Sequence, residues 1–194
     1  PEQARNDIAY VLQHMNVSPG TPMTVQEVVS MGRYSTLGVF RRARSADKEA
    51  VRDAMGLLRI EDLADRQVFR LSGGQRQRVF VAQALAQEHS LLLMDEPLTG
   101  LDIHSAQTID HIIHEEPARG CSVVFTTHDL EEARAADHVI LVNGYVVASG
   151  PPAEALSDQN LATAYGLGLL HPETRSSRGV IDDAHDTSHL HGGV

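Results

Sequence analysis

The sequence predicts an α/β fold: a parallel sheet core that carries an inserted, mainly helical subdomain. After residue 90, short apolar runs alternate with helical segments, which is the pattern of parallel strands joined by crossover helices. Before residue 90, a single short strand is followed by amphipathic helical patterns over residues 14–88. With 194 residues, 42% of them hydrophobic, the chain is long enough to bury a core.

The elements before residue 90 are indicated by their periodicity and by their caps. Thr24 begins a helix with Glu27 three residues later, which is a capping box. Ser72 is a good N-cap for the helix that follows it. The patterns predict a strand over 7–12 and helices over 24–34, 45–58 and 75–88.

After residue 90 the first strand is a continuous apolar run, so we expect it to be buried on both faces. Asn143-Gly144 is a hairpin turn signal and predicts an antiparallel edge on the parallel sheet. Residues 171–194 are polar and are expected to form a disordered tail. The patterns predict strands over 91–94, 122–127, 138–142 and 145–149, and helices over 104–117, 129–136, 152–156 and 158–165.

Charge and composition exclude some function classes. The net charge is −10, with 12 basic and 10 acidic residues in 1–90 against 4 basic and 16 acidic residues in 91–194. This balance argues against a nucleic-acid partner, which favours a basic surface. The single cysteine, Cys121, permits no internal disulfide, and we expect it to be a small buried apolar residue.

Two clusters of residues have the chemistry of a phosphate site. Ser72, Gly73 and Gly74 begin a helix whose free N–H groups and partial positive charge suit a phosphate, and the glycines let a ligand come close. Asp95 and Glu96 follow the strand over 91–94, at the sheet edge where α/β folds bind ligands. One carboxylate there can hold Mg²⁺, and the next can polarise a water molecule.

In this order, LSGGQ (71–75), LLLMDEP (91–97) and TGLD (99–102) resemble the ATP-binding subunit of ABC transporters, and the resemblance runs from about residue 8 to 156. It implies a P-loop NTPase-like (RecA-like) sheet, truncated at the N-terminus. In this scheme residues 1–170 are a partial ATP-binding domain. Residues 14–88 form the helical subdomain with the Q-loop and signature motif, and residues 89–150 the core.

The resemblance assigns roles in ATP hydrolysis. Glu96 matches the catalytic carboxylate, and His128 matches the switch histidine that contacts the γ-phosphate. Asp95 ends the Walker B strand and would hold Mg²⁺. Gln13 matches the Q-loop glutamine, which reaches Mg²⁺ and the attacking water. The implied cofactors are ATP and Mg²⁺.

The resemblance also implies an assembly, in which each nucleotide lies between one subunit's P-loop and the other's signature motif. Ser72, Gly73, Gly74 and Gln75 would contact nucleotide in the partner's site, and Asp102 of the D-loop would link the two sites. The expected partners are a second ATP-binding subunit, integral membrane permease subunits and, indirectly, an extracytoplasmic metal-binding protein. The expected location is the cytoplasmic face of the membrane, as a peripheral protein.

Further stretches, among them 24–38 and 64–85, resemble subunits of manganese and zinc importers, with iron-siderophore importers as the alternative cargo class. Another alternative is a truncated subunit that docks to a partner without hydrolysing ATP. DNA-repair and chromosome-structure ATPases share the signature and Walker B motifs, but they insert long coiled coils, and the stretch between Gln13 and Ser72 has no heptads.

One motif is missing. The only lysine is Lys48, and no GxxxxGK[ST] phosphate loop surrounds it or occurs elsewhere in the sequence. Because the downstream motifs are intact, we interpret the chain as a fragment that starts just before the Q-loop strand; natural loss of the loop is the alternative. Without that lysine and its amide cradle, we expect this chain alone to hydrolyse ATP weakly or not at all.

Overall fold

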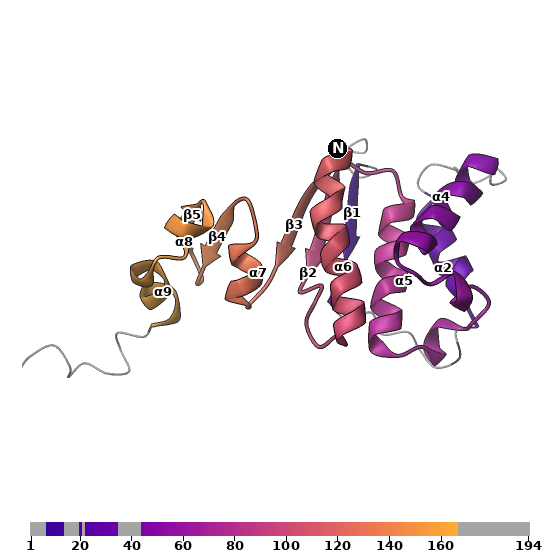
Figure 1. The fold of residues 1–194 in the computed structure, drawn as a ribbon, viewed down its shortest axis with the longest axis horizontal. Coiled ribbons are helices and arrows are strands. Elements are labelled where there is room, and N and C mark those ends of the chain that lie inside the picture. The colour runs from indigo at the N-terminus through magenta and orange to yellow at the C-terminus, as the bar shows by residue number, and fades with distance from the viewer. Residues whose placement is uncertain (1–6, 14–19, 21, 35–43, 167–194) are drawn as a thin grey trace, which may run out of the picture. The chain divides into compact units, whose positions relative to one another are not determined.

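The computed structural model describes residues 7–13, 20, 22–34 and 44–166 (Figure 1). They fall into two compact units, the first ending at Leu130 and the second starting at Glu131. The tail predicted over 171–194 lies outside the described residues.

The first unit is built on a three-stranded parallel sheet, as the sequence predicts. Its strands are β1 (Ile8–Val11), β2 (Leu91–Asp95) and β3 (Ser122–Thr126), in the order β1-β2-β3. The register aligns the first residue of each strand with the first residue of its neighbour. The carboxyl ends of all three strands therefore lie at one edge of the sheet.

Among the described residues, four α-helices accompany this sheet: α2 (Val25–Met31), α4 (Ser45–Leu57), α5 (Gly73–Ala86) and α6 (Ile103–Glu115). Helix α5 is the central one, since it contacts α2, α4, α6 and β1 (Figure 1). The capping boxes of Thr24 with Glu27 and of Ser72 with Gln75 are both formed. The part of this unit that the structure describes also contains three short 3₁₀ helices: η1 (Glu61–Leu63), η2 (Val68–Arg70) and η3 (Glu116–Arg119).

The core lies on one face of the sheet. Alternate strand residues are buried there together with the apolar stripes of α5 and α6; the buried strand residues are Ala9, Val11, Leu92 and Met94. On the other face, Tyr10 and Val124 are more than half exposed, and Leu93 between them is partly exposed. The expectation that β2 is buried on both faces is therefore wrong for the part of the chain that the structure describes, because α5 and α6 share a single face.

A buried arginine fastens the end of α2 to its neighbours. Arg33 Nε donates to Asp47 Oδ1 of α4 at 3.0 Å, and its Nη1 donates to the carbonyl oxygen of Ala86 at the end of α5 at 3.1 Å. The backbone N–H of Arg44 donates to the Asp47 carboxylate, and this bond, with Arg33, lowers the pKa of Asp47. The sequence suggests only a favourable charge in the first turn of α4, yet Asp47 also joins two helices.

The second unit contains an antiparallel hairpin of β4 (Val139–Val142) and β5 (Val146–Gly150), whose turn contains the predicted Asn143-Gly144. Helix α7 (Leu130–Arg134) begins at the unit boundary, and α8 (Pro152–Ala155) and α9 (Asp158–Tyr165) pack on the hairpin. Within the described residues, β4 and β5 form a two-stranded sheet separate from β1-β2-β3. The hairpin was predicted correctly, and its place as an edge of the parallel sheet stays a prediction.

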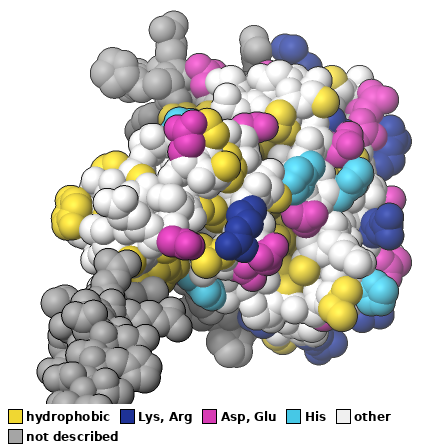
Figure 2. All heavy atoms as spheres, turned by 60° about the vertical axis from the view of Figure 1, so that its left-hand side comes forward, with side chains coloured by type: hydrophobic (Ala, Val, Ile, Leu, Met, Phe, Trp, Pro, Cys, Tyr) yellow, Lys and Arg dark blue, Asp and Glu magenta, His cyan; other side chains and the backbone are white. Residues whose placement is uncertain are grey.

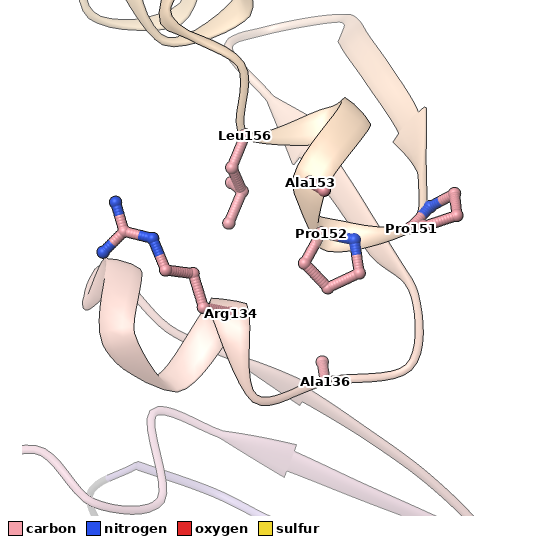
Figure 3. Close-up of a pocket in the computed structure, with 6 residues that line it drawn as sticks. All are labelled: Arg134, Ala136, Pro151, Pro152, Ala153 and Leu156. Atoms are coloured by element: carbon pink, nitrogen blue, oxygen red, sulfur yellow. The ribbon is translucent and has the colours of Figure 1, made fainter.

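A pocket in the second unit contains none of the predicted site residues. Arg134 of α7 and Leu156 line it together with Ala136 and the segment 151–153 (Figure 3). On the face seen in Figure 2, acidic, basic and histidine side chains are interspersed with hydrophobic ones. Of the helices in the described ranges, each is too short or too polar to span a bilayer.

Candidate functional site

Three of the predicted site residues meet where the parallel strands end. Gln13 lies two residues after β1, Glu96 directly after β2 and His128 two residues after β3. Gln13 Nε2 donates to Glu96 Oε2 at 2.7 Å, and His128 Nδ1 lies 3.4 Å from the same oxygen. Gln13 and His128 thus both approach the carboxylate of Glu96 at this edge of the sheet.

The backbone at Glu96 has an uncommon conformation. Its φ is +43°, in the left-handed region that non-glycine residues rarely adopt. The N–H of Glu96 donates to Thr126 Oγ1 at 3.0 Å, and Thr126 Oγ1 donates to Asp95 Oδ1 at 2.6 Å. A single hydroxyl on β3 therefore holds both consecutive acidic residues. Left-handed residues of this kind are retained where the surroundings over-determine them, and they concentrate at functional sites.

Thr126 is a site residue that sequence reasoning missed. One hydroxyl at the end of a strand has no distinguishing pattern. The signal that would have found it is the strand register, since Asp95 and Thr126 are paired at the ends of β2 and β3.

The site is open to solvent, so a ligand can reach it. The side chain of His128 is 70% exposed and that of Glu96 is 29% exposed. Carboxylate and amide oxygens are the ligands that Mg²⁺ prefers, and Asp95 and Gln13 supply one of each. Because Thr126 occupies Oδ1 of Asp95, Oδ2 is the oxygen that suits an ion or its bound water. The residues present therefore fit the predicted Mg²⁺.

The second predicted cluster surrounds the start of α5. Ser72 Oγ accepts from the N–H of Gln75 at 3.2 Å, and Gln75 Oε1 accepts from the N–H of Ser72 at 3.1 Å. The Gln75 side chain is therefore engaged in the capping box. Ser72 and Gly73 are exposed, and nothing lies within 4 Å of the position that a Cβ at Gly73 would take. The helix start is accessible to a phosphate at these two residues.

Gly74 differs from Gly73, because the position that a Cβ would take at Gly74 is occupied by other side chains of this protein. A Cβ at Gly74 would lie 2.4 Å from Asp102 Oδ2 and 2.5 Å from Ser105 Oγ. Asp102 caps α6 by accepting from the N–H of Ser105 at 2.9 Å and from its hydroxyl at 2.8 Å. These bonds, that from the Ser105 N–H first, lower the pKa of Asp102. Gly74 thus lets the starts of α5 and α6 approach, and its contact with nucleotide stays a prediction.

The nine predicted residues therefore form two groups. Gln13, Asp95, Glu96 and His128 lie at the carboxyl edge of the sheet, and Ser72, Gly73, Gly74, Gln75 and Asp102 lie at the starts of α5 and α6. The first group can accept a proton and hold an ion. The second offers backbone and hydroxyl donors to an anion.

Residues 1–99 match the ABC transporter family. The zinc transport system ATP-binding protein TroB of Treponema pallidum is 37% identical over 183 residues, covering 94% of this chain and 68% of that protein. The chelated iron transport system membrane protein YfeB of Yersinia pestis is 37% identical over 92% of this chain, and the manganese transport system ATP-binding protein MntB of Halalkalibacterium halodurans is 37% identical over 83%. The chain spans 60% of the length of YfeB and 65% of that of MntB.

Solved structures agree with these sequence relatives. An inward-facing metal-chelate type ABC transporter superposes with a TM-score of 0.75 at 31% identity, over 82% of this chain and 64% of that one. The ADP conformation of the ATP-binding cassette MJ1267 gives a TM-score of 0.68 at 25% identity, over 84% of this chain and 70% of that one. The fold is therefore that of ABC ATPase domains, as the sequence motifs predict.

Proposed function

The chain belongs to the ABC transporter family, and we propose that it is part of an ATP-binding subunit that couples ATP hydrolysis to metal-ion import, with manganese or zinc as cargo. The observation that carries the proposal is the convergence of Gln13 and His128 on the Glu96 carboxylate. Family membership alone implies ATP as the ligand; this geometry supports a specific division of roles.

Glu96 is the proton acceptor in this proposal. In-line attack of water on the γ-phosphorus breaks the bond to ADP, and Glu96 takes the proton that the water loses. A positioned base of this kind contributes about 10²–10⁴-fold in rate. Oε2 accepts from Gln13 at 2.7 Å, and because a carboxylate oxygen has two lone pairs, this bond orients the carboxylate without preventing it from taking a proton.

The neighbours of Glu96 bind and orient. His128 exposes 70% of its side chain, so its ring can donate to a phosphate oxygen while it remains beside the carboxylate. Asp95 and Gln13 would hold Mg²⁺, which neutralises charge on the phosphate oxygens when bound. Thr126 keeps Asp95 and Glu96 in their present orientation.

The start of α5 would serve a second ATP-binding subunit. Ser72 and Gly73 are exposed at the helix N-terminus, where donors and the helix dipole favour a phosphate. In a head-to-tail homodimer Ser72 and Gly73, together with Gly74 and Gln75, would face the nucleotide of the partner subunit. Asp102 packs against Gly74 and so would couple the two sites.

The relatives support a cargo and a wider assembly for this subunit. The names of MntB and TroB support manganese and zinc, with integral permease subunits and, indirectly, an extracytoplasmic metal-binding protein as partners. The subunit would then lie at the cytoplasmic face of the membrane. A chelated-iron cargo is the alternative that YfeB and the metal-chelate transporter structure favour.

This proposal has a clear test, because the 194 residues contain no GxxxxGK[ST] loop. Their only lysine, Lys48, is exposed on α4, which packs on α2 and α5. We therefore compare this chain with a P-loop chimera, defined as the same chain preceded by a strand–GxxxxGK[ST]–helix segment from an active ABC ATP-binding subunit. Release of radiolabelled phosphate should be at background for the chain alone and clearly above it for the P-loop chimera. Release by the chain alone that Glu96→Gln abolishes would contradict the assigned need for a phosphate loop.

A further inference from the structure

Three metal-ligating side chains meet in the first unit where β2 and β3 begin. His89 precedes β2, Glu116 starts η3 after α6, and Cys121 precedes β3. Their ligand atoms all lie within 4.8 Å of one another. The backbone holds this arrangement, since the N–H of Ser122 donates to the carbonyl oxygen of Ser90 at 2.9 Å and that of Cys121 to the carbonyl oxygen of Glu116 at 3.2 Å.

The His89 ring has a buried nitrogen without a hydrogen bond. Its Nδ1 lies 2.7 Å from the carbonyl oxygen of Gln87. Because a carbonyl oxygen only accepts, Nδ1 carries the proton, and Nε2 of the neutral ring presents a lone pair. Nε2 is buried and makes no hydrogen bond to the described residues, and the side chain is 5% exposed. Buried polar atoms normally have a partner, so a buried nitrogen without a hydrogen bond indicates that a ligand binds there.

Glu116 presents a second acceptor to the same place. Its side chain is 6% exposed, and Oε1 accepts from Arg119 at 3.0 Å. Oε2 faces His89 Nε2 at 3.7 Å, which is longer than a hydrogen bond. When the His89 ring is neutral, two buried acceptors face each other, with the buried sulfur of Cys121 beside them. A cation is the species that satisfies such a set.

We propose that His89, Glu116 and Cys121 bind one divalent transition-metal ion, and that Zn²⁺ is the ion that their nitrogen, oxygen and sulfur donors favour. The bond from His89 Nδ1 to Gln87 and that from Arg119 to Glu116 are the outer contacts that orient metal ligands. With Zn–N and Zn–O near 2.0–2.1 Å and Zn–S near 2.3 Å, a tetrahedral ion separates its donors by about 3.3–3.6 Å. The observed 3.7 Å between His89 and Glu116 is within a few tenths of an ångström of that geometry.

This site is distinct from the nucleotide chemistry. It lies at the amino edge of β2 and β3, whereas Glu96 and His128 follow their carboxyl ends. A five-residue strand at about 3.3 Å per residue separates the two edges. The ion would tie together the α5–β2 loop, the end of α6 and the start of β3. Burial, followed by the charge of Glu116, raises the pKa of Cys121, so ion binding would release a thiol proton.

The single cysteine makes the test specific. Titration of the full chain with Co²⁺ should give a thiolate-to-cobalt charge-transfer band, which only Cys121 can produce, and Zn²⁺ should displace it. Cys121→Ser should abolish the band. His89→Ala and Glu116→Gln should weaken Co²⁺ binding at least about tenfold, as loss of a ligand does. His111→Ala, at an exposed histidine of α6, is the matched control and should leave the band unchanged.

A measurement without variants covers the case in which His89→Ala fails to fold. X-ray absorption of the Zn²⁺-loaded wild-type chain should show one sulfur near 2.3 Å, with nitrogen and oxygen near 2.0–2.1 Å. A folded wild-type chain without the cobalt band would overturn the proposal and leave His89 and Glu116 as an ion pair. A zinc coordination shell without sulfur would also overturn it. So would a His89→Ala variant that binds Co²⁺ with the affinity of the wild-type chain.

Discussion

Gln13 donates a 2.7 Å hydrogen bond to the carboxylate of Glu96, although 83 positions separate the two residues in sequence. The contact exists because β1 and β2 are parallel neighbours, so that their carboxyl ends meet. It ties the residue that would take a proton to the end of β1. A shift of Gln13 would therefore alter the surroundings of the proton acceptor directly.

Thr126 should be a positioning residue for the same carboxylate. Thr126→Val removes the hydroxyl that links Asp95 Oδ1 to the Glu96 N–H and keeps the shape of the side chain. We expect hydrolysis by the P-loop chimera to fall about 10- to 100-fold, since small misplacements of reacting groups cost this much. Thr108→Val, which removes a hydroxyl bond to His104 within α6, should have the parent rate. Equal rates for the two variants would remove Thr126 from the site.

Gly74 and Gly73 offer a matched pair for stability. Gly74→Ala places a Cβ against Asp102 and Ser105, which bond to each other and cannot both withdraw. We expect the free energy of unfolding to fall by about 1–3 kcal/mol, as in other overpacked sites. Gly73→Ala meets open space and should stay within about 0.5 kcal/mol of wild type. Urea denaturation of the 194-residue chain measures both, and equal values would contradict the close approach of α5 and α6.

Ser72 should have two separable roles. Its hydroxyl caps α5, and Ser72→Ala should cost about 1 kcal/mol of stability, whereas Ser72→Gly should cost only a few tenths. Both variants lose the hydroxyl that would donate to the partner's phosphate. We therefore expect both to slow hydrolysis by the P-loop chimera, although only one is clearly less stable. If activity followed stability instead, Ser72 would be a cap alone.

Asp47 should contribute stability that depends on pH. Its pKa is lowered in the folded state by the Arg44 N–H and by Arg33, so its contribution is present above the unfolded pKa of about 3.9. It is lost as the pH falls through the folded pKa. Asp47→Asn should therefore be less stable than wild type at pH 7, with a difference that shrinks below about pH 4. Asp53→Asn, at an exposed position of α4, is the matched control and should stay within about 0.5 kcal/mol of wild type at pH 7 in urea denaturation.

Much of this fold could be predicted from local pattern. The predicted strands and helices lie within about three residues of those observed, because caps such as Thr24 and alternation such as that of β1 are encoded locally. The convergence of Gln13, Glu96 and His128 follows from a general rule, that parallel strands end at a common edge. Their roles in a shared site were predicted from the resemblance of the surrounding motifs to ABC ATP-binding subunits.

The rest depends on contacts between distant residues, which have no local signal. Thr126 and Arg33 act through partners on other elements, and the partner of each becomes known only from strand register or helix packing. The same holds for His89 and Glu116, which no motif connects to Cys121. Cys121 was predicted to be a small buried residue, and it is buried; its neighbours were not predictable.

The most direct test of the account is the rate of ATP hydrolysis by the P-loop chimera with Glu96→Gln. This change keeps the size of the side chain and an oxygen for Gln13, but it removes the proton acceptor. We predict that the rate falls by about 10²–10⁴-fold while ATP still binds, and that Glu115→Gln, at an exposed position of α6, leaves it unchanged. Hydrolysis by the Glu96→Gln chimera at the parent rate would contradict the role assigned to Glu96.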